Sequence, residues 1–246
     1  MAEKKAVNKV VEPTNEEIDA HVDQLVAKAQ VALSKFEEFT QEQVDYIVAK
    51  CSVAGLDAHG TLAEAAVNET GRGVFEDKAV KNLFACEYVT SNLRHLKTVG
   101  IINEDPLLGI TEIAEPVGVV CGIVPTTNPT STVIFKSLIC LKTRNPIIFS
   151  FHPSAHACSV MAAVVIRDAA IAAGAPEDCI QWLDLKSMYA TTALMKHPGV
   201  ATILATGGNA MVAAAYSCGK PALGVGAGNV PAYVEKSCVL KRAVND

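Results

Sequence analysis

The stretch VGVVCGIVPTTNPT, residues 117–130, decides the fold of this chain. It is an apolar run that ends abruptly in prolines, threonines and an asparagine. Similar apolar runs follow at 146–151, 179–185, 200–206 and 221–226. Helical patterns separate the runs, at 130–142, 154–173, 187–195 and 208–218. Apolar strands that alternate with helices predict an α/β fold with a parallel, Rossmann-like sheet of about five strands.

The residues before this stretch follow a helical period. Apolar residues share one stripe over 15–36, and the capping box of Thr40 and Gln43 predicts the start of a second helix. A short helix near 60–69 ends at the Gly71–Gly73 break, and a long helix is predicted over 76–96. The predicted sheet is therefore accompanied by a set of N-terminal helices.

Between these helices and the first strand, the pattern becomes that of a β-hairpin. The segments KTVGII and LGITEIAE flank the turn NEDP, which predicts a hairpin over 97–115. Its residues alternate poorly between apolar and polar, so we expect the hairpin to protrude. Residues 1–14 mix charge with a proline and are expected to form a mobile arm, and residues 15–246 are expected to form the domain itself.

Composition excludes several classes of protein. The 246 residues include 21 Lys and Arg and 26 Asp and Glu, for a net charge of −5, and 50% are hydrophobic. Such a chain is not disordered, and it has no general basic surface for nucleic acid. No apolar stretch reaches the length of a membrane span without a polar break, and the N-terminus lacks the apolar core of a signal peptide. We therefore expect a cytoplasmic protein with no membrane contact.

The eight cysteines form no CxxC pair and lie mostly in apolar runs. This pattern is typical of small buried hydrophobes in a reducing compartment, and no Cys/His cluster has the spacing of metal ligands. No metal site is expected. A catalytic nucleophile among the cysteines is not recognisable from composition.

In an open parallel sheet, ligands bind beyond the carboxyl ends of the strands. Here these ends carry small, polar and glycine-rich segments, namely 125–130, 152–153, 206–208 and 226–229. Thr206-Gly207-Gly208 directly precedes a helix, so its backbone suits a diphosphate, although a plain strand–helix turn explains it too. Gly224-x-Gly226-x-Gly228 is a weak nucleotide fingerprint, and close packing of the strand is an equal explanation.

Two polar residues at these ends are candidates for chemistry. The amide of Asn128 suits a hydrogen bond to a developing oxyanion, with an Asx turn before Pro129 as the alternative. His152 fits an acid or base, but a place in a pocket wall or at the surface explains it better. Glu69, Arg72 and Asp77 fit solvated or capping roles. The residues alone thus predict a dinucleotide site without a visible nucleophile.

Longer runs carry a resemblance. Residues 114–155 and 203–231, together with FTQEQVDYIV (39–48) and ETGRGVFEDKAVKN (69–82), closely resemble the aldehyde dehydrogenase half of bacterial bifunctional aldehyde-alcohol dehydrogenases. The resemblance covers nearly the whole chain. It implies an NAD-dependent enzyme that converts acetaldehyde and CoA to acetyl-CoA and NADH, reversibly. It also implies homo-oligomers, with filaments of the full-length protein, and iron only in the alcohol dehydrogenase half.

The resemblance also assigns residues. It implies that the nicotinamide side of the NAD site is lined by Ile123, Val124, Pro125, Thr126, Thr127 and Asn128. It further implies that Gly208 and Gly226 contact NAD. Asn128 matches the Asn whose amide holds the oxygen of the thiohemiacetal and thioester, in agreement with the oxyanion reading above.

The chain departs from the pattern of aldehyde dehydrogenases at two places that bear on its chemistry. Hydrolytic aldehyde dehydrogenases carry a water-activating Glu in the segment that matches Gly224–Gly228, and this chain has no carboxylate there. A thiol such as CoA is then the natural acceptor. The family's nucleophilic Cys stands in a Cys-Ala-Ser-Glu type motif that none of the eight cysteines matches, so we expect a fragment that lacks the nucleophile.

Two alternatives stay open. The chain as it stands fits a non-catalytic NAD-binding or assembly module. A CoA-independent semialdehyde dehydrogenase, such as glutamyl-phosphate reductase, shares the fold, but the run PTTNPTS speaks against it.

Overall fold

The computed structural model describes residues 13–228 and 231–245. The predicted arm over 1–14 lies almost entirely outside these residues. Thr14, which is described, is the N-cap of helix α1 (Asn15–Phe36) and forms a capping box with Glu17. The second capping box, of Thr40 with Gln43, starts α2 (Gln41–Asp57) as predicted.

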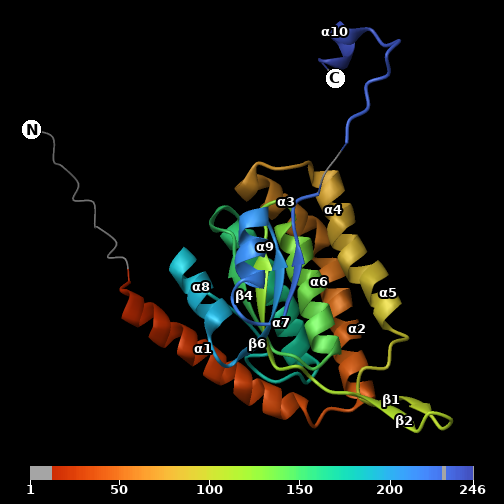
Figure 1. Cartoon of the computed structure of the whole chain (residues 1–246), viewed down its shortest axis with the longest axis vertical. Coiled ribbons are helices and arrows are strands. Elements are labelled where there is room, and N and C mark those ends of the chain that lie inside the picture. The colour runs from red at the N-terminus through yellow and green to blue at the C-terminus, as the bar shows by residue number, and fades with distance from the viewer. Residues whose placement is uncertain (1–12, 229–230, 246) are drawn as a thin grey trace, which may run out of the picture.

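Five parallel strands form the central sheet (Figure 1). They are β3 (Val119–Val124), β4 (Ile147–Phe151), β5 (Ile180–Trp182), β6 (Val200–Thr206) and β7 (Ala222–Val225). Their order is β5-β4-β3-β6-β7, so the chain works outward in one direction from β3 and then returns to place β6 on the other side of β3. This is the order of a Rossmann half, with its topological switch point between β3 and β6. The predicted fold class is confirmed.

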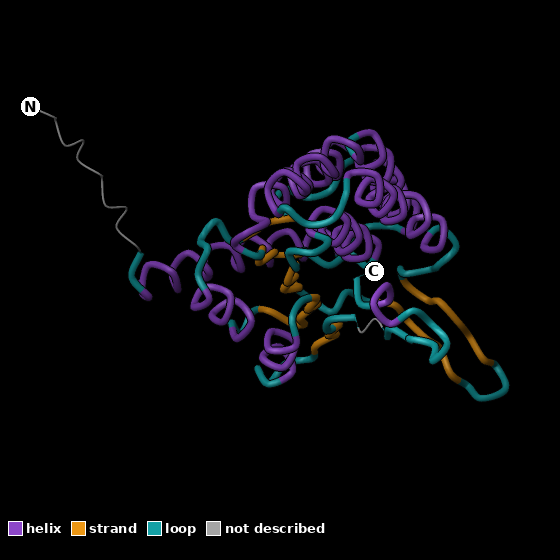
Figure 2. Tube along the Cα trace, turned by 90° about the horizontal axis from the view of Figure 1, so that it is seen from above, coloured by secondary structure: helices purple, strands orange, loops and turns teal. Residues whose placement is uncertain are grey.

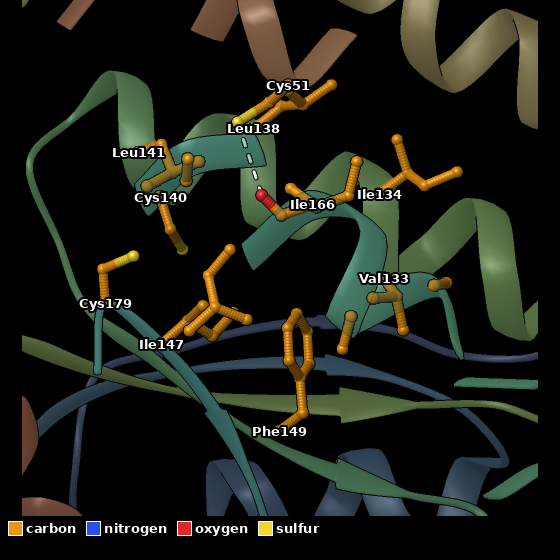
Figure 3. Packing of buried hydrophobic residues seen from close by; sticks show 14 of the residues in the cluster. Cys51, Val133, Ile134, Leu138, Cys140, Leu141, Ile147, Phe149, Ile166 and Cys179 are labelled. Atoms are coloured by element: carbon orange, nitrogen blue, oxygen red, sulfur yellow. Dashed lines mark hydrogen bonds between the residues drawn. The ribbon is translucent and has the colours of Figure 1, made fainter. Parts of the chain in front are cut away.

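Helices cover both faces of the sheet. One face packs against α6 (Pro129–Lys142) and α7 (His156–Ala172), around Phe149 and Ile147, and α2 packs on these two helices (Figure 3). The other face packs against α1 and α8 (Met188–Lys196), and α9 (Asn209–Tyr216) lies beside β6 and β7. Gly122 in β3 allows the first core to close, because a Cβ there would lie 2.8 Å from side-chain carbons of Ile147 and Phe149.

The cysteines contribute to these cores. Six are buried, namely Cys51, Cys86, Cys121, Cys140, Cys158 and Cys179. In Cys140 and Cys179 burial raises the thiol pKa to about 12, and it raises that of Cys51 further. Cys51 donates its thiol hydrogen to the carbonyl of Ile166 at 3.6 Å (Figure 3). These thiols therefore act as small apolar groups.

The remaining helices precede the sheet. They are α3 (His59–Thr70), α4 (Phe75–Leu83), the π-helical turn η1 (Phe84–Tyr88) and α5 (Val89–Leu93). α3 ends at Gly71 in the left-handed region, with φ 61°. The predicted single helix over 76–96 is interrupted by η1 and ends earlier. A short helix, α10 (Leu240–Ala243), begins after Val239 and lies apart from the sheet (Figure 1).

The segment Pro153–Ala172 is long and apolar enough to cross a membrane by length and composition alone. Core helices pass the same test, and α7 packs between α2, α6 and the sheet, with Ile166, Ala162 and Ala163 fully buried. The core accounts for part of its apolar composition, since 39% of the apolar window is buried.

The hairpin consists of β1 (Gly100–Asp105) and β2 (Ile110–Ala114), and it projects from the body (Figures 1 and 2). The predicted turn at 103–106 is wrong by three residues, because the turn lies at 106–109. The carboxylate of Asp105 accepts the N–H groups of Leu107 at 2.9 Å and Leu108 at 3.0 Å, and Gly109 has φ 67°. This local turn chemistry lengthens the first strand by the residues that the sequence pattern assigned to the turn.

Candidate functional site

The candidate site lies where β3, β6 and β7 end on the same edge of the sheet. Ile123 pairs with Ala205 across the switch point, and Thr206 pairs with Val225 of β7. The topology therefore brings the segment 125–128, the glycines after β6 and Gly226 to one edge. The side chains of Ile123 and Val124 are buried in the two cores, whereas Pro125, Thr126 and Asn128 are half-buried and Thr127 is exposed.

Asn128 is the N-cap of α6, yet its side chain makes no cap hydrogen bond. Asparagine is a preferred N-cap because its side-chain oxygen normally accepts an N–H of the first helical turn. Here Asn128 Oδ1 is buried and has no hydrogen-bond partner among the described residues, and Nδ2 only reaches Thr127 Oγ1 at 3.5 Å. The Asx-turn alternative is not observed, so the carboxamide is not committed to its own helix.

A second polar atom in this loop, Thr126 Oγ1, is also buried without a hydrogen-bond partner in the described parts of the chain. Buried polar atoms are almost always paired in native proteins. Two such atoms within one loop at the switch point indicate a site that is completed by another group.

An apolar groove of about 390 Å³ opens beside Asn128. It is lined by Lys81, Phe84, Ala85, Val89, Asn128, Ser131, Thr132 and Phe135. The π-helical turn η1 forms one wall, where Phe84 stacks on Tyr88 with ring centroids 5.4 Å apart. Single π-helical turns are frequent at functional sites. The groove places the Asn128 carboxamide at the edge of an apolar surface.

The glycines at positions 208 and 226, both at this edge of the sheet, differ in whether packing requires them. Gly208 has φ −66°, and a Cβ there would meet nothing within 4 Å, so neither backbone strain nor packing requires a glycine. It is the N-cap of α9 and offers no side chain to the N–H groups of that helix. A Cβ at Gly226, in contrast, would lie 2.7 Å from Asn209 Oδ1, which also accepts the N–H of Ala227 at 3.3 Å. Packing alone therefore explains Gly226, while open space surrounds Gly208.

Lys136 joins the two strands of the switch point and is not among the site residues expected from the sequence. Its ammonium group donates to the carbonyl of Ile123 in β3 at 2.6 Å and to that of Leu204 in β6 at 2.5 Å. It is 2% exposed, and burial lowers its pKa to about 7. The available signal was a lysine within the apolar helix run STVIFKSLICL.

The other candidates have structural roles. His152 accepts the N–H of Ser154 through Nδ1 at 3.1 Å and caps a short 3-10 turn at the surface. Glu69 accepts the N–H groups of Ala157 at 2.9 Å and Cys158 at 2.7 Å and so caps α7. Within the ranges the structure describes, no group of three or more His, Cys, Asp and Glu side chains is placed to hold a metal ion.

Comparison with known proteins identifies the family. The profile described as "Aldehyde dehydrogenase family" matches residues 3–246. The chain belongs to the aldehyde dehydrogenase family. This agrees with the resemblance seen in the sequence.

Among curated relatives of this aldehyde dehydrogenase chain, "Aldehyde-alcohol dehydrogenase 2" of Entamoeba histolytica is 71% identical over 93% of the chain and 27% of its own length. "Bifunctional aldehyde-alcohol dehydrogenase AdhE" of Escherichia coli is 53% identical over 92% of the chain and 25% of its own length. The chain thus spans about a quarter of these relatives.

Solved structures show the same fold. An acetylating aldehyde dehydrogenase from Geobacillus thermoglucosidasius is 47% identical with a TM-score of 0.87, over 96% of this chain and 52% of that one. Rhodopseudomonas palustris propionaldehyde dehydrogenase with bound propionyl-CoA is 33% identical with a TM-score of 0.75, over 85% and 46%. An engineered glycolyl-CoA reductase with bound NADP+ is 31% identical with a TM-score of 0.75, over 97% and 52%.

Proposed function

We propose that this chain is the cofactor-binding part of an NAD-dependent, CoA-acylating acetaldehyde dehydrogenase within a bifunctional aldehyde-alcohol dehydrogenase. The reaction takes acetaldehyde, CoA and NAD to acetyl-CoA and NADH, and runs in both directions. The observation that carries the proposal is the carboxamide of Asn128, which its own helix leaves uncommitted at the switch point of a Rossmann sheet.

The described residues fit a nicotinamide dinucleotide. The first N–H groups of α9 lie beside Gly208, where nothing from the chain approaches within 4 Å of a Cβ position, and helix N-termini favour phosphate. The nicotinamide side of the site is lined by Pro125, Thr126, Thr127 and Asn128. The buried hydroxyl of Thr126 has no hydrogen-bond partner among the described residues and is available to the cofactor. NAD supplies the hydride acceptor. Support comes also from the related reductase with bound NADP+.

Asn128 stabilises the oxygen of the reacting aldehyde. A side-chain amide donates a hydrogen bond to the negative charge that develops on this oxygen, and such donors are effective because they are held in place before the reaction. The apolar groove beside Asn128 accommodates the small alkyl group of the aldehyde. Water activation has no candidate in Gly224–Gly228, which lacks a carboxylate. CoA is therefore the acyl acceptor, in line with the propionyl-CoA bound to the related enzyme.

The protein acts as a cytoplasmic homo-oligomer, with filaments of the full-length form. The buried, unpaired thiols suit a reducing compartment. The exposed isoleucines and leucines of the hairpin suit contact with a neighbouring subunit. Iron belongs to the alcohol dehydrogenase half.

The alternative is a module that binds NAD or assembles without catalysis. It is favoured, for the 246 residues themselves, by the six buried cysteines, because a thiol with a raised pKa is a poor nucleophile.

The test is NADH formation from acetaldehyde and NAD, with and without CoA, by the complete gene product and by the 246-residue chain. We expect CoA-dependent turnover by the former, and NAD binding without turnover by the latter. Equal rates with and without CoA contradict the acylating function. Robust turnover by the 246-residue chain contradicts the expectation that it lacks a nucleophile, and directs attention to Cys218, which is not among the six buried cysteines.

A further inference from the structure

Two buried polar side chains on α4 bond residues on either side of Asn128, one through a backbone carbonyl and one through a side-chain hydroxyl. Lys78, 5% exposed, donates from Nζ to the carbonyl of Thr127 at 2.9 Å. Asn82, 1% exposed, accepts through Oδ1 the hydroxyl hydrogen of Thr130 at 2.8 Å. The residues before and after Asn128 are thus fixed to the same neighbouring helix.

The two side chains form one unit, which we term the α4 clamp (Lys78 and Asn82). Residues four apart lie on the same face of a helix, so both point toward the start of α6. The amide nitrogen of Asn82 donates to the carbonyl of His59 at 2.9 Å, which ties the clamp to α3. Lysine and asparagine are rarely buried without a specific partner. Here one partner, Thr127, directly precedes Asn128, and the other, Thr130, lies in the first turn of α6.

The backbone at Asn128 differs from that of the caps that do use their side chains. Thr14, Thr40 and Ser187 have ψ values of 161°, 165° and 135°, and each side chain accepts an N–H of its helix. Asn128 has φ −137° and ψ 62°, and its side chain accepts none. The conformation in which Asn128 fails to cap α6 is the conformation that the clamp holds.

We propose that Lys78 and Asn82 are positioning residues that keep the carboxamide of Asn128 away from its own helix and directed to the reacting aldehyde. This rests on the proposed function of Asn128. Without the clamp, Asn128 relaxes to an ordinary N-cap, and its amide oxygen accepts an N–H of α6. The donor geometry is then lost although the cofactor cradle after β6 is untouched.

The test uses the complete gene product and the variants Lys78→Met and Thr130→Val, each also combined with Asn128→Ala. We expect each clamp variant to lower kcat by roughly ten- to a hundredfold, because small displacements of a positioning group have effects of this size. KM for NAD stays nearly unchanged. In the Asn128→Ala background the same changes lower kcat no further, since the group they position is gone.

Conservative and matched variants separate positioning from folding. Lys78→Arg keeps a cationic donor and Thr130→Ser keeps the hydroxyl, so both recover most of the lost rate. Glu76→Gln, on the exposed side of the same helix, leaves kcat unchanged. Should Lys78→Met fail to fold, Thr130→Val carries the test, because valine has the shape of threonine.

The outcomes distinguish the two proposals. Clamp variants that leave kcat unchanged, or that lower it equally in the Asn128→Ala background, overturn the clamp while the function stands. An Asn128→Ala variant with unchanged kcat overturns the oxyanion role itself, and the clamp with it. A crystal structure of Thr130→Val in which Asn128 still avoids α6 also contradicts the clamp.

Discussion

Strand β3 and the β1–β2 hairpin both carry β-branched apolar residues, mainly valine in β3 and isoleucine in the hairpin, but the chain covers only one of the two. All six residues of β3 are buried, between β4 and β6 and beneath helices on both faces. No residue of β1 or β2 is buried, and Leu107 at the hairpin tip is 97% exposed. Apolar residues indicate that a segment will be covered, and only the surrounding chain shows by what.

The hairpin is nevertheless firmly attached at its base. Directly before β1, Gln41 Oε1 accepts the N–H groups of Thr98 at 2.7 Å and Val99 at 3.1 Å. At the end of β2, the buried Arg144 donates to the carbonyl of Ala114, and it also donates to that of Glu37, both at 3.0 Å. The hairpin therefore holds a defined direction while its apolar residues face outward.

The largest effect is expected at the proposed contact between the hairpin and a second subunit. The change Ile110→Lys with Ile113→Lys should shift the complete gene product to smaller species in light scattering, with its helices intact. Burial of one isoleucine contributes roughly 1.5–3 kcal/mol, so the double change removes roughly 3–6 kcal/mol of association free energy per hairpin. An unchanged oligomer, or global unfolding, counts against a role of the hairpin in assembly.

Truncation in the core beneath β3 comes next. Phe149→Ala should lower the free energy of unfolding by about 3–5 kcal/mol, because the side chain is fully buried against Gly122 and the α6–α7 layer. Leu107→Ala is the matched control at the hairpin tip and should change stability by less than about 0.5 kcal/mol. Chemical denaturation of the 246-residue chain measures both. A large effect at Leu107 would show that the hairpin is covered within the chain.

The carboxyl end of β3 should show a large effect on rate rather than on stability. Asn128→Ala in the complete gene product should lower kcat by about 10²–10³, or about 2.7–4 kcal/mol, as expected for one lost oxyanion donor. NAD affinity should remain nearly unchanged. Collapse of NAD binding with kcat preserved would make Asn128 a cofactor residue only.

The smallest effect is expected at the N-terminal cap of α7, a helix that packs on the central sheet. Burial raises the pKa of Glu69, but the N–H bonds from Cys158 and Ala157 and the charge of Lys186 outweigh it, and the net pKa lies below its ordinary value of 4.5. The carboxylate therefore stabilises the fold at pH above its ordinary pKa, and this is lost as the pH falls through the lowered value. Glu69 is largely exposed, so Glu69→Gln should cost only roughly 0.3–1 kcal/mol at neutral pH.

Denaturation at neutral and acid pH checks the sign. The difference between the parent chain and Glu69→Gln should shrink at acid pH. A difference that grows on acidification would show that Glu69 is not the charged cap of α7.

Local features of the sequence account for most of the fold. Apolar runs and their spacing predicted the five strands and the helices between them, because strand and helix periods are properties of neighbouring residues. The capping box at Thr40 fixed the start of α2. The hairpin turn was predicted three residues too early, because Asp105 caps the turn from within the strand that precedes it.

The sequence by itself also determined the edge at which the site lies, since strand ends and their polar residues are adjacent in the chain. Only the tertiary structure decided which groups complete it. Lys136 bonds a carbonyl that lies 68 residues away, and Lys78 bonds one that lies 49 away. Every residue carries a backbone carbonyl, so no sequence pattern marks the few that accept a buried lysine. For the same reason the sequence did not show that the carboxamide of Asn128 is uncommitted. That state follows from the backbone conformation of Asn128, which a helix distant in the sequence holds.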